Sequence, residues 1–397
     1  MDIVCGFGRE GSEWALRPTL VETTMPRQGL PPEILDLIVD CLRHESTTLK
    51  ACCLASKSLV PRSRRHIFAR VEFDSARSSI ESWTRAFPDP SNSPAHYTLR
   101  LYIHDPKVFS TNVSTWISSF HRVQELVVNT LMWGGPRMVS FVQLHGLSPT
   151  LKSLHVSTLT ISISEIFGLI CSFPLLEELS LHSHRESDAD GWVIPPTSPK
   201  LTRSLRLRGR NSSIIRELLN LPGGLHFTKI RVRCDVRDVD TRAIMDLVSK
   251  CSNTLESLYF RYYPLRAFPL VYTVARSLTV SPVISRTPPV LDLSSATKLK
   301  YLEFRWGRCN VRWMTMTLHT VQLTDLRRIT IFLHNIMSDP TEEKLQEWHE
   351  LDHLLVQLWA SHSILPRVLY KNAREGLLTR LLPELTSGGF VCKEGER

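Results

Sequence analysis

The feature that most limits the fold of this chain is a short apolar pattern that recurs along most of its length. Each unit reads apolar-x-x-apolar-x-apolar, as in SPTLKSLHV, FPLLEELSL and ATKLKYLEF. The middle apolar residue of successive units falls at positions 126, 154, 179, 205, 230, 258, 302 and 329. These positions are 25 to 28 residues apart, except for one interval of 44. Such regular spacing indicates an array of similar units that pack on one another, and not a set of unrelated domains.

Each unit is expected to contain a strand followed by a helix. The last apolar residues of a unit alternate with polar ones, which is the period of a β-strand. The intervening segments, such as 161–174 and 241–253, carry apolar residues at helical spacing. An earlier strand is expected around Leu99, and a closing strand near position 368. The interval 262–298 allows two interpretations, an inserted loop or one further unit.

The period and the pattern resemble leucine-rich repeats, in which a short strand and a helix stack into a solenoid. The resemblance implies an α/β fold, with an irregular leucine-rich-repeat solenoid and a curved parallel sheet over residues 76–385, and a flexible tail over 386–397. The family places an asparagine or cysteine three residues after the last strand leucine, where it bonds the backbone of the turn. In this chain other residues stand there: Leu159, His184, Arg210, Asp235 and Tyr263.

Residues 29–75 follow a different pattern, that of three short helices after a flexible lead-in of residues 1–28. Pro31 and Pro32 suit the first turn of a helix, where the backbone N–H groups have no helical partner. The second helix is expected at about 48–59 and the third at 62–69. A core this small is not secure alone, so the segment either packs on the remainder of the chain or binds a partner. A wide apolar stripe on the first helix favours a partner: Ile34, Leu35, Leu37, Ile38, Cys41 and Leu42.

This segment, LPPEILDLIVDCLRHESTTLKACCLASKSLVPRSRRHIFARVEF, residues 30–73, resembles the F-box domain in the form common among fungal F-box proteins. The family often has tryptophan where Leu59 stands. The resemblance implies that the three helices dock on a Skp-type adaptor and, through it, on a cullin. The residues that would contact the adaptor are Leu30, Pro31, Ile34, Leu35, Ile38, Leu54 and Leu59.

Arginines are expected to gather on one face of the sheet. If Leu205 and Leu207 point into the core, then Arg206 and Arg208 point to the other face, because side chains alternate along a strand. Neighbouring strands lie about 4.8 Å apart, and like charges at that distance are unfavourable unless an anion lies between them. We therefore expect a site for an acidic or phosphorylated segment of a target protein, held by bidentate guanidinium contacts.

The residues expected to bind the target are Arg206, Arg208, Arg231, Arg233, Tyr259, Arg261 and Arg305. The same count places further side chains on that face: His155, Ser157, Ser180, His182, Glu303, Thr330 and Phe332. A second interpretation is that the arginines only keep an exposed sheet soluble, with acidic residues of the loops as counter-charges.

Composition favours an acidic partner and gives no sign of catalysis. The net charge is +9 and the pI is about 9.2. Nine scattered cysteines without a CxxC pair, together with the lack of a leader, are typical of reduced thiols, so we expect a cytoplasmic or nuclear protein. No apolar run reaches the roughly 18 residues of a spanning helix, so no membrane partner is expected. No phosphate loop, HExxH or nucleophile elbow is present, and we expect neither enzymatic activity, nor a cofactor, nor a bound metal.

These observations and resemblances lead to one expected function and one alternative. The chain is expected to be the substrate-recognition subunit of a Skp–cullin–F-box ubiquitin ligase, acting in ubiquitin-dependent degradation. Residues 29–75 would hold the adaptor, the repeats would hold a target protein of unknown identity, and the partners would perform the chemistry. The alternative is a repeat scaffold that binds RNA or acidic protein independently of ubiquitin. Of these partners, nucleic acid is the less expected.

Overall fold

The structure is a computed structural model of the 397-residue chain. It describes residues 30–74, 79–104, 108, 114–129, 141–147, 149–187, 198–209, 212–235, 241–263, 290–306, 311–334, 340–374 and 376–394. The chain divides into two compact units. Unit 1 comprises residues 1–133 and 139–151, and unit 2 comprises residues 134–138 and 152–397. Each unit is described separately below.

Unit 1 begins with the three expected helices. They are α1 (Pro32–Cys41), α2 (Ser46–Ala55) and α3 (Val60–Ile67), with a 3-10 turn, η1 (Lys57–Leu59), before α3. The second helix ends at Ala55, earlier than expected, because Ser56 is extended and its hydroxyl accepts the backbone N–H of Ser58 to start η1. The third begins at Val60, since Pro61 fits the first turn of a helix.

The carboxylate of Asp40 on α1 is hydrogen-bonded to two side chains of α3. Arg62 donates two hydrogen bonds to Asp40, one of them from Nε to Oδ1 at 2.6 Å. His66 Nε2 lies 2.7 Å from the same Oδ1. The hydrogen bonds from Arg62, and after them the one with His66, hold the pKa of Asp40 well below its ordinary value. The ionised carboxylate is therefore part of the packing of α1 on α3.

Replacing Asp40 with asparagine is expected to weaken the attachment of α1. The pKa of Asp40 is lowered in the folded protein. The stabilisation that the carboxylate provides is therefore complete at pH values above about 3.9, the ordinary pKa of aspartate. It is lost only as the pH falls through the lower pKa of the folded state. Hydrogen exchange of the α1 amides, compared at equal pH, should show less protection in Asp40→Asn at pH 7. The difference should persist at about pH 3, where an ordinary aspartate is mostly protonated. Equal protection of the two proteins at pH 7 would show that this contact does not hold the helix.

Three parallel strands continue unit 1 after the helices. They are β1 (Arg70–Phe73), β2 (Arg100–Ile103) and β3 (Glu125–Asn129), with Val71 opposite Leu101 and Leu101 opposite Leu126. The residue of the early strand that corresponds to the repeat marker is therefore Leu101, and not the expected Leu99. Strand β1 lies at the end of the segment expected to be helical. The elements between these strands are α4 (Ile80–Ala86), η2 (Pro90–Asn92), η3 (Pro94–Tyr97) and α5 (Ser114–Ile117), and η6 (Val142–Gly146) follows β3.

An aromatic cluster packs the end of α3 against the first strands. Phe68 follows α3, and its ring centroid lies 6.0 Å from that of Trp83 on α4. Trp83 in turn contacts Phe73 of β1 at 5.8 Å and Phe120 at 5.7 Å. Edge-to-face and tilted pairs at these distances are favourable beyond the area that they bury. The three helices thus pack on the adjoining repeats, which was one of the two expected possibilities.

Unit 2 contains nine strands among its described residues, and every strand pairs in parallel with the next along the chain. The strands are β4 (Ser153–Ser162), β5 (Glu178–Ser187), β6 (Ser204–Gly209), β7 (Lys229–Asp235), β8 (Ser257–Tyr263), β9 (Tyr301–Trp306), β10 (Arg328–His334), β11 (Leu365–Lys371) and β12 (Val391–Lys393). Parallel pairing of consecutive strands requires a crossover between them. The predicted α/β class with a parallel sheet is confirmed.

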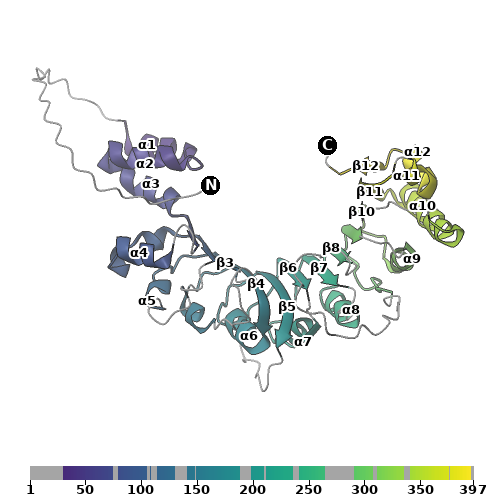
Figure 1. Ribbon diagram of the computed structural model, residues 1–397, viewed down its shortest axis with the longest axis horizontal. Helices are drawn as coiled ribbons and strands as arrows, with labels where there is room; N and C mark the ends of the chain where they lie inside the picture. The colour runs from purple at the N-terminus through teal and green to yellow at the C-terminus, as the bar shows by residue number, and fades with distance from the viewer. Residues whose placement is uncertain are drawn as a thin grey trace, which may run out of the picture. The chain divides into compact units, whose positions relative to one another are not determined.

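The crossovers of unit 2 are mostly helical. The helices are α6 (Ile163–Cys171), α7 (Ser212–Leu219), α8 (Thr241–Lys250), α9 (Val311–Thr320), α10 (Glu342–His362), α11 (Leu377–Leu381) and α12 (Pro383–Ser387). Helices α6 to α9 lie on one side of the strands (Figure 1). We call the other side of the strands β4–β12 the open face. In the described part of the chain, no helix is both long and apolar enough to cross a membrane.

The apolar repeat residues form the core between the strands and the helices. Successive markers lie opposite one another in the sheet, and all are buried: Leu154, Leu179, Leu205, Ile230, Leu258, Leu302 and Ile329. Burying one such side chain stabilises the fold by about 1.5–3 kcal/mol. The expected core positions are therefore buried on every strand from β4 to β10.

Three features differ from, or refine, the expectations. Strand β4 continues through Leu159, where the family would have its turn-bonding asparagine, as far as Ser162. Strand β8 pairs directly with β9, so the long interval adds no strand between them; its residues 264–289 lie outside the described residues. Strand β12 pairs with β11 in a region expected to be a flexible tail.

Candidate functional site

A basic groove lies on the open face over strands β6 to β9. It has a volume of about 350 Å³. All seven residues expected to bind a target line it, together with one acidic residue: Arg206, Arg208, Arg231, Arg233, Tyr259, Arg261, Arg305 and Glu303. Six arginines and one glutamate give this lining a strong positive charge. The alternation rule thus placed the groove correctly; what the groove binds remains a prediction.

The sheet register arranges these side chains in two rows. One row contains Arg206, Arg231, Tyr259 and Glu303, one from each strand from β6 to β9. The second row, two residues further along each strand, contains four arginines: Arg208, Arg233, Arg261 and Arg305. Adjacent members of a row start about 4.8 Å apart, and the two rows lie about 6.6 Å apart. The six arginines of the groove therefore start from backbone positions with short and nearly regular spacings.

The β9 end of the groove has its own counter-charges. Arg305 donates from Nε to Glu303 Oε1 at 3.0 Å, and its Nη1 lies 3.8 Å from Glu394 Oε1, just after β12. Its guanidinium also stacks on the buried ring of Phe332, 3.7 Å from the ring centre. Such contacts with an aromatic ring are favourable for a cation. Arg305 is consequently held by the protein itself, and Phe332 serves as its support.

Tyr259 separates the two ends of the groove. Its ring lies between the guanidinium groups of Arg231 and Arg305, each 5.6 Å from the ring centre. Burial is the main cause that raises the pKa of Tyr259 above its ordinary value, so the hydroxyl stays protonated at neutral pH. Tyr259 therefore offers an aromatic surface and a hydrogen-bonding hydroxyl, with no negative charge.

Arg206 and Arg231, the members of the first row at the β6–β7 end of the groove, have little compensation. Among the described residues, Arg206 makes no ion pair, and the buried Nε of Arg231 has no acceptor. Lys229, two residues before Arg231 and outside the groove lining, adds a third cation beside this end. Its pKa is lowered, first by burial and then by the charges of Arg231 and Arg206. The sequence interpretation missed Lys229, although the alternation that placed Arg231 places position 229 on the same side.

The residues expected to contact an adaptor lie just before α1, on α1, on α2 and on η1 of unit 1. Leu30, Ile34 and Ile38 are 42–56% exposed, and Leu54 of α2 is 90% exposed. Pro31 is exposed, whereas Leu35 and Leu59 are half-buried. Leu37, named in the apolar stripe but not as an adaptor residue, is also exposed. Positions 30, 34, 37 and 38 follow helical spacing, so α1 presents one apolar face to solvent.

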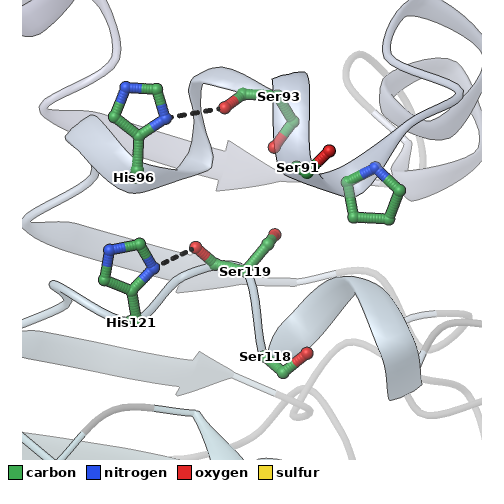
Figure 2. A pocket seen from close by; sticks show the side chains of 7 residues that line it. Ser91, Ser93, His96, Ser118, Ser119 and His121 are labelled. Carbon is green, nitrogen blue, oxygen red and sulfur yellow. Dashed lines mark hydrogen bonds between the residues drawn. The ribbon is translucent and has the colours of Figure 1, made fainter.

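A second, smaller hollow of about 230 Å³ lies in unit 1. Figure 2 shows two imidazoles above one another, those of His96 and His121, with the serine side chains beside them. His96 Nδ1 lies 2.9 Å from the carbonyl oxygen of Ser93, and His121 Nδ1 lies 3.1 Å from that of Ser119. These histidines are one repeat apart and bond to the backbone of a turn in each case. We therefore attribute to them a role in shaping successive turns.

Comparisons with known proteins add little. No family model matches the chain, and no curated protein sequence matches it. Among solved structures, this chain is similar to the leucine-rich repeat-containing protein LegL7 from Legionella pneumophila, with a TM-score of 0.38 and 11% sequence identity. The similarity covers 80% of this chain and 97% of that chain. Nothing about function follows from a similarity of this size.

Proposed function

We propose that this chain is a non-catalytic receptor subunit that joins two proteins. The apolar face of α1 would dock on a Skp-type adaptor, as the resemblance of residues 30–73 to the fungal type of F-box implies. The basic groove would hold an acidic or phosphorylated segment of a target protein. In a Skp–cullin–F-box ubiquitin ligase, holding the target near the transfer machinery raises its effective concentration. The observation that carries the proposal is the exposed apolar face of α1.

That face is difficult to explain as part of an ordinary small core. Within α1 and α2, the buried apolar side chains are Val39 and Leu49. Ten large apolar side chains are exposed in the described part of the chain, and five of them lie between positions 30 and 54: Leu30, Ile34, Leu37, Ile38 and Leu54. Concentrated apolar exposure is typical of a binding surface. Spacings of three and four residues are the usual anchors by which a helix enters an apolar groove.

The direct test is binding of the purified full-length chain to a purified Skp-type adaptor. We expect a complex that survives size-exclusion chromatography and high salt, because apolar burial is not screened by ions. Absence of a complex at micromolar concentrations of both proteins would remove the adaptor from the proposal. The scaffold alternative would then be the better explanation of the groove.

That alternative, a scaffold that binds RNA or acidic protein independently of ubiquitin, is supported by the charge of the groove. RNA binding through this surface should fall steeply as salt increases, because each neutralised phosphate releases counterions. A fluorescent single-stranded RNA titrated at several salt concentrations checks this, and affinity insensitive to salt would exclude binding through the groove. Among the described residues, Tyr259 is the one aromatic side chain that lines the groove, and the guanidinium groups of Arg231 and Arg305 already lie 5.6 Å from its ring centre, so base stacking has little support. Acidic protein is thus the better candidate ligand.

A further inference from the structure

We infer that the β6–β7 end of the groove is a subsite for a phosphate monoester, bound by Arg206, Arg231 and Lys229 and carried on a phosphorylated side chain of the target. This inference rests on the proposed function, since the same groove would receive the target. It assigns the anion to one end of the groove and assigns the β9 end a structural role. It also adds Lys229 to the binding residues.

The geometry brings three cationic groups to one place. Arg206 and Arg231 are direct neighbours on adjacent strands, so their Cα atoms are about 4.8 Å apart. Lys229 lies on the same side of β7 as Arg231, about 6.6 Å along the strand. A tetrahedral group lying between these side chains can accept hydrogen bonds from all three. Arginine forks fit phosphate oxygens in pairs, and lysine adds a point charge.

The acidic residues near this end are already engaged elsewhere. Glu178 on β5 lies 3.5 Å from Nε of Arg203 and 3.2 Å from the hydroxyl of Ser153. Glu303 on β9 accepts the hydrogen bond of Arg305. Burial is the largest cause of the lowered pKa of Lys229, but among the charges Arg231 and Arg206 act on it more strongly than Glu303 and Glu178. The field of these four residues at Lys229 is therefore positive, and an anion bound there would be stabilised.

The buried Nε of Arg231 is a second and independent indication of a ligand. This atom is a hydrogen-bond donor for which the described residues provide no acceptor. A buried donor without an acceptor is costly, and such groups are rare in folded proteins. A bound anion would supply this acceptor once the Arg231 side chain turned its Nε toward the groove. The groove volume of about 350 Å³ is sufficient for a phosphorylated side chain.

A phosphate ester suits this end better than a carboxylate. A carboxylate brings one negative charge and two oxygens, whereas a phosphate monoester brings a charge of about −1.5 to −2 and three strong acceptor oxygens. Two guanidinium groups and an ammonium group provide more charge and more donors than a carboxylate can use. The number of cations thus favours a phosphorylated residue over glutamate or aspartate.

The test uses the full chain and three labelled peptides that differ at one central position, phosphoserine, glutamate or serine, in an alanine–glycine context. Calorimetric titration into the millimolar range should show the order phosphoserine above glutamate above serine. Free phosphate should compete with the phosphoserine peptide. Each of Arg206→Gln, Arg231→Gln and Lys229→Gln should weaken its binding by about tenfold or more, because each removes charged hydrogen bonds.

The matched control is Arg328→Gln. Arg328 lies on β10, stacks over Tyr301 at 5.3 Å and is not part of the groove lining. Arg328→Gln should leave the affinity for the phosphoserine peptide unchanged. A similar loss of affinity in this variant would show that the peptide responds only to the net charge of the protein. Equal binding of the glutamate and phosphoserine peptides would overturn the phosphate assignment. No binding of the phosphoserine peptide by a chain that still captures the adaptor would overturn the subsite alone, whereas failure of adaptor capture would overturn the proposed function.

Discussion

Replacing Ile34 and Ile38 together with glutamate is expected to lower the affinity for a Skp-type adaptor by about a thousandfold. Both side chains lie on the exposed apolar face of α1. In the proposed complex each would be buried, and the loss of one such anchor costs about 2 kcal/mol or more. Two anchors at 1.4 kcal/mol per factor of ten give about three orders of magnitude. Calorimetric titration with the purified adaptor measures the change directly.

The control for this prediction is an equally exposed leucine far along the chain. Leu175 lies in unit 2 and is more than half exposed, so Leu175→Glu introduces one charge at a site with no proposed partner. It should leave the adaptor affinity unchanged. Because Ile34 and Ile38 are exposed in the free chain, the double variant should keep the native circular dichroism spectrum. Full adaptor binding by a folded double variant would disprove docking through α1.

Phe304→Ala is expected to lower the free energy of unfolding of unit 2 by about 3–5 kcal/mol. Phe304 is fully buried on β9, and its ring lies edge-on to Trp313 of α9, with the centroids 5.9 Å apart. Removing the ring loses its transfer free energy and leaves a cavity, because the stacked repeats relax only partly around it. Chemical denaturation followed by tryptophan fluorescence measures the change.

The same strand provides the matched control. Tyr301 lies on β9 three residues before Phe304, on the open face, and is exposed. Tyr301→Ala removes a ring of similar size and should cost much less, since little packing is lost. Equal destabilisation by the two substitutions would contradict the assignment of the two faces of the sheet. It would also remove the basis on which the groove residues were placed.

The core and the position of the groove could be predicted from the sequence because they follow from local periodicity. A strand has a period of two, so the assignment of Leu205 and Leu207 to the core fixed the side of Arg206 and Arg208. The repeat interval then aligned these residues with Arg231 and Arg233 on the next strand. The same logic failed by two residues at the irregular start, where Leu101, and not Leu99, lies opposite Leu126.

Whether a groove residue has a partner within the protein could not be predicted in this way, because such pairing depends on contacts between segments that are distant in the sequence. Arg305 looked equivalent to Arg208 in the repeat pattern, yet Glu394 approaches Arg305 from the end of the chain. Nothing in the spacing of residues predicts that contact. The orphaned Nε of Arg231 likewise depends on how closely neighbouring side chains cover it.

The sequence by itself determined the repeat length and the side of the sheet on which the arginines lie. These two properties arise from the pattern of apolar and polar residues within short segments, where each residue's environment depends on its neighbours in the chain. The parallel pairing of the strands was implied by the resemblance to leucine-rich repeats. Only the tertiary structure decided which cations have counter-charges and which do not, and which apolar side chains of α1 stay exposed. Charge compensation and burial depend on what surrounds a side chain in space, and those surroundings come from residues that are far apart in the sequence.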